Sequence, residues 1–373
     1  MTSILEDGLE ISQYKVMLVT NQLQVSPSGG RELLSRLNHD VLKEIYGDRL
    51  ILIELSRNRL QGLKTVINGF QGHIDGLNEA VILRALQTIH TENVGKVFVD
   101  GSNLGGFVKV VKQTLPQVEV SVFFHNVEAR FFLGSLWQTK TLRALAVLIV
   151  NYFAERKSIR YGDKLICLSE RDSTLLRRLY GRAASHVSPM AMQDKSPAGM
   201  PQINNDVSKK FALFVGGVFY ANKAGIAWFV KHVVPRIQIN ICIVGKGFEE
   251  LKDVLELDEK VEVVGAVDSL ANWYQDAHFV IAPIFDGSGM KTKVAEALMF
   301  GKKIVGTPEA FSGYEDVTDQ AGWVCTSADD FVAAIWRAQE LPLKKYDLEL
   351  RALYEEKYSF ISAKARLNLI MNT

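Results

Sequence analysis

Short apolar runs, each about as long as a β-strand, alternate with amphipathic stretches along nearly the whole chain. Within a run the residues are apolar at consecutive positions rather than at alternate ones, as in FVIAPI at 279–284. A strand of this kind is buried on both faces, which is typical of a parallel sheet covered by helices. The chain is therefore predicted to be an α/β protein. The predicted strands span 14–20, 49–55, 96–100, 118–124, 164–169, 211–217, 239–245, 261–266, 279–284, 302–307 and 323–326.

The alternation is interrupted at residues 186–210, where three prolines and many polar residues indicate a linker. A chain of 373 residues is long enough for two domains. We therefore expect doubly wound, Rossmann-like domains over 1–205 and 206–350. A final helical stretch over 351–373 could cross back to the first domain. In open parallel sheets ligands bind beyond the carboxyl ends of the strands, so the loops after the strands are where a site is expected.

Composition narrows the classes of function. The net charge is +1, so no overall field favours nucleic acid as a partner. Cys167, Cys242 and Cys325 are far apart, so neither a disulfide framework nor a cysteine metal site is expected. The N-terminus lacks the basic and apolar regions of a signal peptide, and the apolar stretch 142–154 is shorter than the roughly 20 residues that span a bilayer. We expect a cytoplasmic protein.

A glycine-rich turn with two lysines leads into a predicted helix within residues 285–300. Gly287 and Gly289 let backbone N–H groups come close to a ligand, and a helix N-terminus adds free donors and a partial positive charge. A lysine in the first turn, Lys291, is disfavoured by the helix dipole unless an anion joins it. The turn therefore predicts phosphate binding. It is neither a Walker A loop nor a G-x-G-x-x-G fingerprint.

The helix is expected to begin near Met290. Its periodicity places one set of residues on the core side and another toward a cleft or solvent. The core-side set is Met290, Val294, Ala297 and Leu298, and the opposite set is Thr292, Lys293 and Glu296.

The segment PIFDGSGMKTKVAEALMFGKKIVGTPEAFSGYE resembles the C-terminal signature of family-four retaining glycosyltransferases, which have the GT-B fold. FALFVGGVFYANKAGIAWFVKHVVPRI and INICIVGKG are similar to the opening elements of the same family's donor domain. The similarity covers about Phe211 to Glu315 well. It is thinner in the first half, at GGRELL, FFHNVEARFF and CLSERD. The resemblance implies two Rossmann-like domains facing across a cleft, with a nucleotide-sugar donor held mainly by the C-terminal domain.

The resemblance also assigns the donor site residue by residue. Glu296 matches a glutamate that binds the ribose hydroxyls, and Lys291 could neutralise the diphosphate. Lys223 lies, in sequence, near the position at which the family has a basic residue that contacts phosphate. The remaining donor-binding candidates are the small or loop-forming residues Gly29, Gly30, Gly216, Gly287, Gly289, Met290 and Thr292.

One departure concerns the reacting sugar. Many family members carry a Glu-x7-Glu pattern, and here Ser288 stands where the first glutamate is expected. Asp286 could substitute for it, so Ser288 and Asp286 are both catalytic candidates. His125 matches a histidine that faces the donor sugar, although it could also cap the next helix.

The acceptor side is assigned more thinly. Asn103, Asn126 and Glu128 follow strands of the first domain and are the acceptor candidates. Glu128 could orient His125 or simply begin a helix, where a carboxylate suits the dipole.

The expected reaction moves a sugar from a nucleoside-diphosphate donor to a hydroxyl of a saccharide or a lipid-linked glycan. Neither a metal nor a cofactor is expected, and the resemblance implies retention and a role in bacterial surface polysaccharide or glycoconjugate synthesis. Residues 130–160 mix aromatic, apolar and basic side chains, so they could rest on the inner face of the cell membrane, or pack as a helix pair. The alternatives are a sugar-nucleotide 2-epimerase of the same fold and a non-catalytic partner of another transferase.

Overall fold

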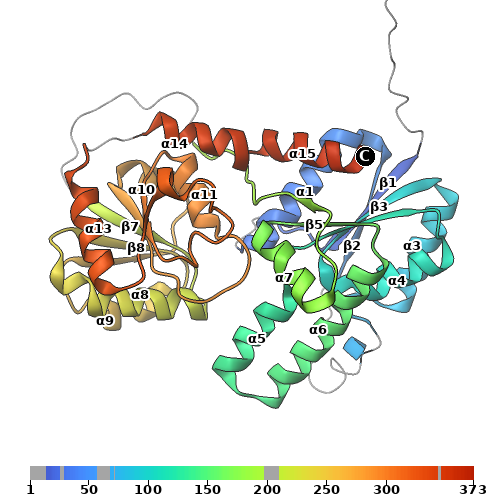
Figure 1. Ribbon diagram of the computed structural model, residues 1–373, viewed down its shortest axis with the longest axis horizontal. Helices are drawn as coiled ribbons and strands as arrows, with labels where there is room; N and C mark the ends of the chain where they lie inside the picture. The colour runs from blue at the N-terminus through green and yellow to red at the C-terminus, as the bar shows by residue number, and fades with distance from the viewer. Residues whose placement is uncertain (1–13, 26–28, 57–67, 71, 197–209, 343–345) are drawn as a thin grey trace, which may run out of the picture.

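The computed structural model describes residues 14–25, 29–56, 68–70, 72–196, 210–342 and 346–373. The chain forms two lobes, each a parallel sheet between helices (Figure 1). The first sheet has the strand order β2-β1-β3-β4-β5-β6 and the second has β12-β11-β10-β7-β8-β9. Strand order reverses direction between β1 and β3 and again between β7 and β10. The prediction of two doubly wound parallel sheets is confirmed.

Each predicted strand of the first half is present. Its strands are β1 (Lys15–Asn21), β2 (Leu50–Leu55), β3 (Val94–Asp100), β4 (Glu119–Phe123), β5 (Lys164–Cys167) and β6 (His186–Val187). Its helices are α1 (Gly30–Tyr46), α3 (Glu79–Thr91), α4 (Gly105–Thr114), α5 (Glu128–Thr139), α6 (Leu142–Tyr161) and α7 (Glu170–Tyr180). The short strand β6 was not predicted. It lies inside the expected linker and pairs in parallel with β5.

The second half repeats the pattern. Its strands are β7 (Phe211–Val215), β8 (Asn240–Val244), β9 (Val261–Gly265), β10 (Phe279–Ala282), β11 (Ile304–Gly306) and β12 (Gly322–Val324). Its helices are α8 (Tyr220–His232), α9 (Lys252–Leu255), α10 (Ala271–Asp276), α11 (Thr292–Met299), α12 (Thr318–Ala321) and α13 (Ala328–Glu340). Side-chain caps mark several helix starts, as in α13, where Ser327 and Asp330 form a reciprocal capping box.

The connection between the two sheets is partly built into the core. Met190, Ala191 and Met192 are buried although they lie in the expected linker. The Met192 carbonyl accepts a hydrogen bond of 2.9 Å from the Tyr354 hydroxyl. Thus the apolar half of this segment is packed, and its remaining part, 197–209, lies outside the described residues.

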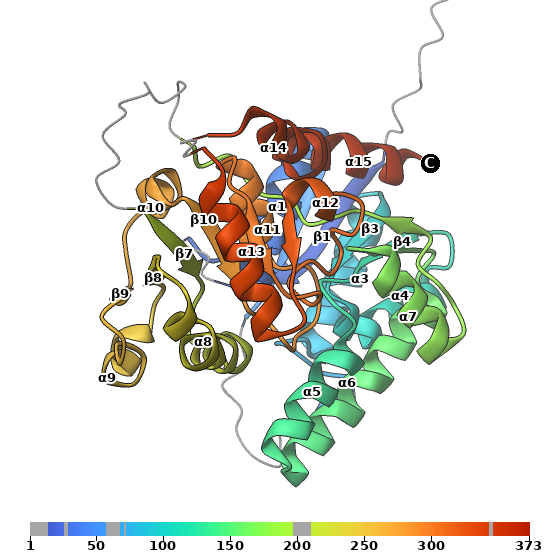
Figure 2. The ribbon, with the colours of Figure 1, turned by 60° about the vertical axis from the view of Figure 1, so that its left-hand side comes forward.

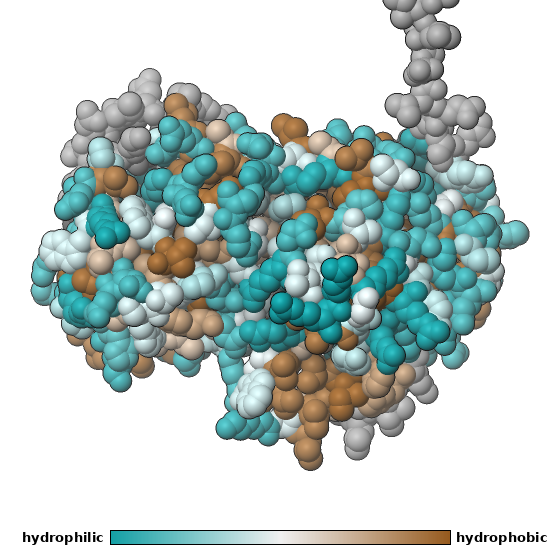
Figure 3. Space-filling view, viewed as in Figure 1, coloured by the Kyte–Doolittle hydropathy of each residue, from teal (hydrophilic) through white to brown (hydrophobic). Residues whose placement is uncertain are grey.

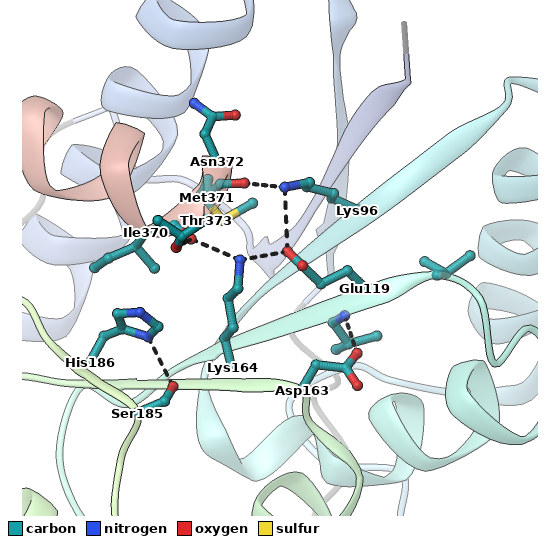
Figure 4. Close-up of polar contacts among 12 residues, drawn as sticks. Lys96, Glu119, Asp163, Lys164, Ser185, His186, Ile370, Met371, Asn372 and Thr373 are labelled. Carbon is teal, nitrogen blue, oxygen red and sulfur yellow. Dashed lines mark hydrogen bonds and ion pairs between the residues drawn. The ribbon is translucent and has the colours of Figure 1, made fainter. Parts of the chain in front are cut away.

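The C-terminal helices α14 (Leu348–Leu353) and α15 (Phe360–Asn372) run from the second lobe to the first (Figures 1 and 2). The end of α15 lies at the amino-terminal edge of the first sheet (Figure 4). There Lys164 donates to the Ile370 carbonyl over 2.9 Å, and Lys96 donates to the Met371 carbonyl. Both lysines also face Glu119. Cations at the last carbonyls stabilise a helix end, so this contact fixes α15 on the first domain.

Candidate active site

The loop after β10 reaches α11 through two glycines with positive φ, +145° at Gly287 and +65° at Gly289. The helix begins at Thr292, two residues later than predicted, because Lys291 has an extended backbone at the N-cap position. Met290 therefore precedes the helix. It is buried, and its sulfur accepts a hydrogen bond of 3.3 Å from the Met190 backbone N–H. In the structure, the Met290 side chain packs beneath the loop.

The charge of Lys291 is already matched within the protein. Its Nζ donates to the Glu309 carboxylate over 2.9 Å and to the Gly289 carbonyl over 2.8 Å. Burial lowers the pKa of Lys291, and the neighbouring carboxylate of Glu309 opposes this shift. Glu309 also pairs with Arg171 of α7 over 3.0 Å, across the domain boundary. Glu309 therefore supplies a negative charge within the protein, and the expected role of Lys291 toward a diphosphate stays a prediction.

Lys293 is the basic residue that the sequence reasoning did not single out. The prediction placed it toward a cleft or solvent, but it is buried, as are all residues of α11 after Thr292. Its Nζ donates to Asn222 Oδ1 over 3.0 Å and lies 4.3 Å from the centre of the Phe214 ring. Burial lowers the pKa of Lys293 to about 7. Within the described residues no carboxylate pairs directly with it.

The side-chain amine of Lys293, a residue of α11, lies close to the end of β7. A Cβ added at Gly216, the residue after β7, would lie 3.4 Å from Lys293 Nζ and 2.6 Å from Asn222 Nδ2. Thus Lys293 lies under the first loop of the second sheet, beside the switch point between β7 and β10, where doubly wound sheets bind ligands. Lys223, the lysine predicted for phosphate contact, is exposed on α8.

Glu296 is also buried rather than open to solvent. It accepts a hydrogen bond of 2.9 Å from the hydroxyl of Tyr274, a residue of α10. Burial raises the pKa of Glu296, while Tyr274 and nearby lysines oppose the shift. A second acceptor position on the carboxylate would remain for a ribose hydroxyl, so that role stays a prediction.

Asp286 and the glycine loop contact the first domain. The Asp286 carboxylate accepts from the Gly287 backbone N–H over 2.8 Å and lies 3.4 Å from Gln138 Nε2 and 3.7 Å from Arg130 of α5. Ser288 is half-buried beside it. A Cβ on Gly289 would approach the His125 carbonyl to 2.9 Å. The loop therefore needs glycine at this position in order to lie against the first domain.

On the facing side, His125 follows β4 and is buried. Its Nε2 lies 3.0 Å from Asp100 Oδ1, at the end of β3. Asp100 also accepts from Thr20 over 2.7 Å and from Asn38 over 2.8 Å. Burial alone would raise the pKa of Asp100, but His125 and the hydrogen bonds outweigh it and hold the pKa well below its usual range. An ionised Asp100 thus lies beside the His125 ring at the domain boundary, although neither ring nitrogen makes a well-aligned hydrogen bond within the described residues.

A polar cluster lies beside this pair, at the ends of β1 and β3. Arg31 donates to Asp75 over 2.9 Å, and Asn103 donates to the same carboxylate over 2.7 Å. Arg31 and Asp75 line a cavity of about 140 Å³, together with Asn21, Gln22, Leu23, Gln24, Glu32 and Ser35. Amide and carboxylate groups of this kind suit the hydroxyls of a sugar. Asn103 therefore contributes by holding two of the charged groups that line the cavity, Arg31 and Asp75.

Glu128 is the first residue of α5 and is buried. Burial raises its pKa to about 7, and although Arg31 opposes the rise, Glu155 and Asp75 add to it. The Glu155 carboxylate accepts hydrogen bonds of 2.9 and 3.2 Å from the backbone N–H groups of Glu128 and Ala129, so it caps α5. Asn126, next to the boundary, has a buried Oδ1 with no hydrogen-bond partner.

The other candidates differ in what surrounds them. A Cβ on Gly30 would lie 3.5 Å from the Thr292 methyl group, so the start of α1 meets the start of α11 across the boundary. A Cβ on Gly29 would meet nothing within 4 Å. No group of three or more histidine, cysteine, aspartate or glutamate side chains that could hold a metal occurs among the described residues.

Sequence reasoning missed Lys293, Arg31, Asp75, Asp100 and Glu309. Asp100 could have been found, because a carboxylate that ends a buried strand lies at the ligand-binding edge of a parallel sheet. Asp75 and Glu309 had no such signal, since each acts through a partner distant in sequence.

Comparison with known proteins agrees with this geometry. Residues 209–340 match the family model for glycosyl transferases group 1. No curated protein sequence matches the chain.

Solved structures share the whole fold at low sequence identity. A sucrose-phosphate synthase from Thermosynechococcus elongatus has a TM-score of 0.73 and 14% identity, covering 96% of this chain and 98% of its own. HepE from Anabaena, in complex with UDP and glucose, has a TM-score of 0.67 and 12% identity, and the match covers 96% of this chain and 100% of HepE. The lipopolysaccharide outer core galactosyltransferase WaaB, in its apo form, has a TM-score of 0.62 and 12% identity, and the match covers 96% of this chain and 99% of WaaB. The arrangement of two domains predicted from the sequence is therefore the GT-B fold.

Proposed function

We propose that this chain, a GT-B-fold glycosyltransferase that carries a group 1 glycosyltransferase domain over residues 209–340, moves a sugar from a nucleoside-diphosphate sugar to an acceptor hydroxyl. The observation that carries the proposal is the buried Lys293 under the loop after β7. A buried cation without a directly paired carboxylate is costly unless an anion joins it. The diphosphate of a donor is an anion of suitable charge, and the UDP bound by HepE is of this chemical class.

The roles of the donor side follow from charge development. The bond between the anomeric carbon and the diphosphate oxygen breaks, so negative charge grows on the diphosphate. Lys293, the glycine-loop N–H groups and the start of α11 would stabilise that charge. Glu296 would accept from the ribose hydroxyls, held in place by Tyr274.

The roles of the acceptor side follow from its carboxylates. His125 would lie beside the donor sugar, with its ring next to Asp100. The acceptor hydroxyl would enter from the cavity beside Arg31 and Asp75, with Asn103, Asn126 and Glu128 around it. The acceptor oxygen takes the place of the diphosphate on the anomeric carbon and passes its proton to the departing diphosphate oxygen.

Finer features of the reaction are part of the same proposal. Transfer proceeds with retention, the acceptor is a surface polysaccharide or another glycoconjugate, and the enzyme acts at the inner face of the cell membrane. The fold of WaaB, a lipopolysaccharide galactosyltransferase, supports the choice of acceptor class. Asp286 and Ser288 would lie nearest the sugar on the donor side, in the position of the missing glutamate.

The test is a panel of nucleotides and nucleotide-sugars scored by thermal shift, followed by product analysis with the nucleotide-sugar that binds. A ligand at a hundredfold excess over Kd stabilises the folded state by about 2.7 kcal/mol. We expect one nucleotide and its nucleotide-sugar to raise Tm. When acceptor is supplied, that nucleotide-sugar should release its nucleoside diphosphate. Release of an epimerised nucleotide-sugar without acceptor would instead identify a 2-epimerase. A panel without any shift would contradict the proposal and favour a non-catalytic partner.

A further inference from the structure

Helices α5 and α6 form an antiparallel hairpin, residues 128–161, that projects from the first domain (Figures 1 and 2). Its base is packed: a Cβ on Gly105 of α4 would come within 1.9 Å of the Ala154 carbonyl. Its tip is the turn around Lys140, which has a left-handed backbone. The hairpin therefore has a fixed base at the site and a tip that extends away from it.

The tip exposes large apolar side chains on both helices. Trp137 is 71% exposed and Leu142 is 86% exposed. The space-filling view shows a hydrophobic area at the bottom of the molecule, where this hairpin projects, with pale and hydrophilic residues at its left side (Figure 3). The apolar tip consists of Leu133, Trp137, Leu142, Leu145, Ile149 and Phe153.

On α6 the exposed residues other than Arg143 recur every three or four positions, so they form one stripe along the helix. The stripe begins with Leu142 and is apolar as far as Phe153. It continues as Arg156 and Arg160, which are also exposed. Apolar side chains therefore occupy the far end of the stripe, and cations occupy the end nearer the body of the protein.

The charges of the hairpin have one sign. Its six basic residues are Arg130, Lys140, Arg143, Arg156, Lys157 and Arg160. Its two acidic residues, Glu128 and Glu155, are both buried. The whole chain has a net charge of only +1, so this surface is basic by local concentration.

We propose that the apolar tip of the α5–α6 hairpin docks on the surface of an anionic lipid bilayer. Apolar side chains would enter the interface between headgroups and acyl chains, while the cations beside them meet anionic headgroups. Long arginine and lysine side chains can extend to the headgroups while their stems cover apolar surface. No helix of the described residues is long and apolar enough to cross a membrane, so the hairpin lies on the bilayer.

A second copy of the chain fits this surface less well. Two copies meeting through the same face would bring basic hairpins together without an exposed carboxylate on either hairpin to balance them. A lipid surface rich in anionic headgroups has the complementary charge.

The position of the tip gives the docking a use in the proposed transfer. The hairpin begins at Glu128, directly after His125 and Asn126 at the candidate site. The 12 residues of α5 span about 18 Å, so an acceptor anchored in the bilayer would be held near the acceptor cavity. This use rests on the proposed function, whereas the docking itself does not.

The test is flotation with vesicles of phosphatidylcholine and phosphatidylglycerol, and with vesicles of phosphatidylcholine alone. We expect the full chain to bind only the anionic vesicles. The double variant Trp137→Ser/Leu142→Ser should lower the partition coefficient by at least about tenfold. The matched control Leu257→Ser/Ile361→Ser removes two apolar side chains of similar exposure, 81% and 78%, elsewhere on the surface and should bind as the wild type does.

A second readout locates the contact. Trp137→Phe keeps an aromatic residue at the tip and should keep binding, but it should lose most of the quenching by brominated lipids. The proposal is overturned by absence of binding to anionic vesicles, by equal binding of the tip variant and the control, or by quenching that persists without Trp137. Self-association that the tip variant abolishes, without vesicle binding, would overturn it in favour of a second copy.

Nucleotide-sugar binding measured without vesicles separates this proposal from the enzymatic one. Retained donor binding with no vesicle binding defeats the docking alone. Vesicle binding that depends on the tip, in a protein that binds no nucleotide-sugar, supports the docking and defeats the transferase.

Discussion

The two sides of the candidate site differ in how their buried charged groups are paired. On the side of the second sheet, Lys291 is matched by Glu309, whereas the direct partners of Lys293 among the described residues are a neutral amide and an aromatic ring. The glycine loop and the start of α11 add further positive potential. On this side, therefore, Lys293 is the buried lysine to which the proposed function assigns the diphosphate.

The side of the first sheet carries an excess of carboxylates. Asp75, Asp100, Glu128 and Glu155 lie within one network, with Arg31 as a cation and the His125 ring beside Asp100. Such a side disfavours a diphosphate and suits neutral hydroxyl groups. Under the proposed function, this difference would place the diphosphate and the acceptor hydroxyl on opposite sides of the reacting carbon.

Glu128→Gln would test the acceptor side most strongly. Its folded-state pKa of about 7 lies above the ordinary value of 4.5. The folded protein keeps this proton to a higher pH than the unfolded chain, so the wild type loses stability as pH rises from about 4.5 to 7. The variant should therefore gain up to about 3 kcal/mol at pH 8 and progressively less at lower pH. Denaturant unfolding of both proteins from pH 5.5 to 8 measures this, and a pH-independent difference would contradict it.

Lys293→Met would test the donor side. Loss of a charged hydrogen bond to phosphate should weaken donor binding by about tenfold to a hundredfold. Methionine fits a buried site beside Phe214, so stability should be unchanged or higher. Calorimetry gives Kd, with Lys223→Met as the control, because that lysine is exposed on the neighbouring helix.

Wild-type affinity should also fall as pH rises above 7, because the pKa of Lys293 in the free protein is about 7 and the neutral amine cannot pair with phosphate. Equal affinity of Lys293→Met and wild type would contradict the role of Lys293. A larger loss of affinity in Lys223→Met would favour Lys223 as the phosphate contact.

Gly289→Ala would disturb the contact between the two sides. The alanine would adopt a φ of +65° and place a Cβ 2.9 Å from the His125 carbonyl. Left-handed backbone alone costs about 1–2 kcal/mol, so transfer should slow by about tenfold. Gly181→Ala is the matched control, since its φ is also positive, +81°, but a Cβ there meets nothing within 4 Å. Steady-state rates for both variants decide whether the close approach matters.

Arg171→Met should have the smallest effect. The Arg171–Glu309 pair joins the two sides, but Arg171 is 37% exposed, and exposed pairs contribute about 0–1 kcal/mol. Donor affinity should change by less than about fivefold. A larger loss, measured by the same calorimetry, would mean that this pair controls the approach of the two domains.

Local pattern was sufficient for most of the fold. Consecutive apolar residues in FVIAPI and KLICLS gave buried parallel strands because burial on both faces leaves that mark in the sequence itself. The same holds for Gly287 and Gly289, whose backbone freedom is a property of the residue type. The start of α11 was placed two residues too early because Met290 continues the apolar period outside the helix.

Burial and pairing could not be read from the sequence. The face of α11 expected to meet solvent is covered by β7, α8 and α10, which supply Phe214, Asn222 and Tyr274. The partner of Lys291 comes from the loop after β11, and the cap of α5 comes from α6.

The sequence by itself determined the two parallel sheets, the glycine turn and the helix that follows it, since each depends on neighbouring residues. Tertiary structure alone decided which lysine is left without a carboxylate and which glutamate has a pKa of about 7. The physical reason is that desolvation and electrostatic pairing depend on groups brought together from distant parts of the chain.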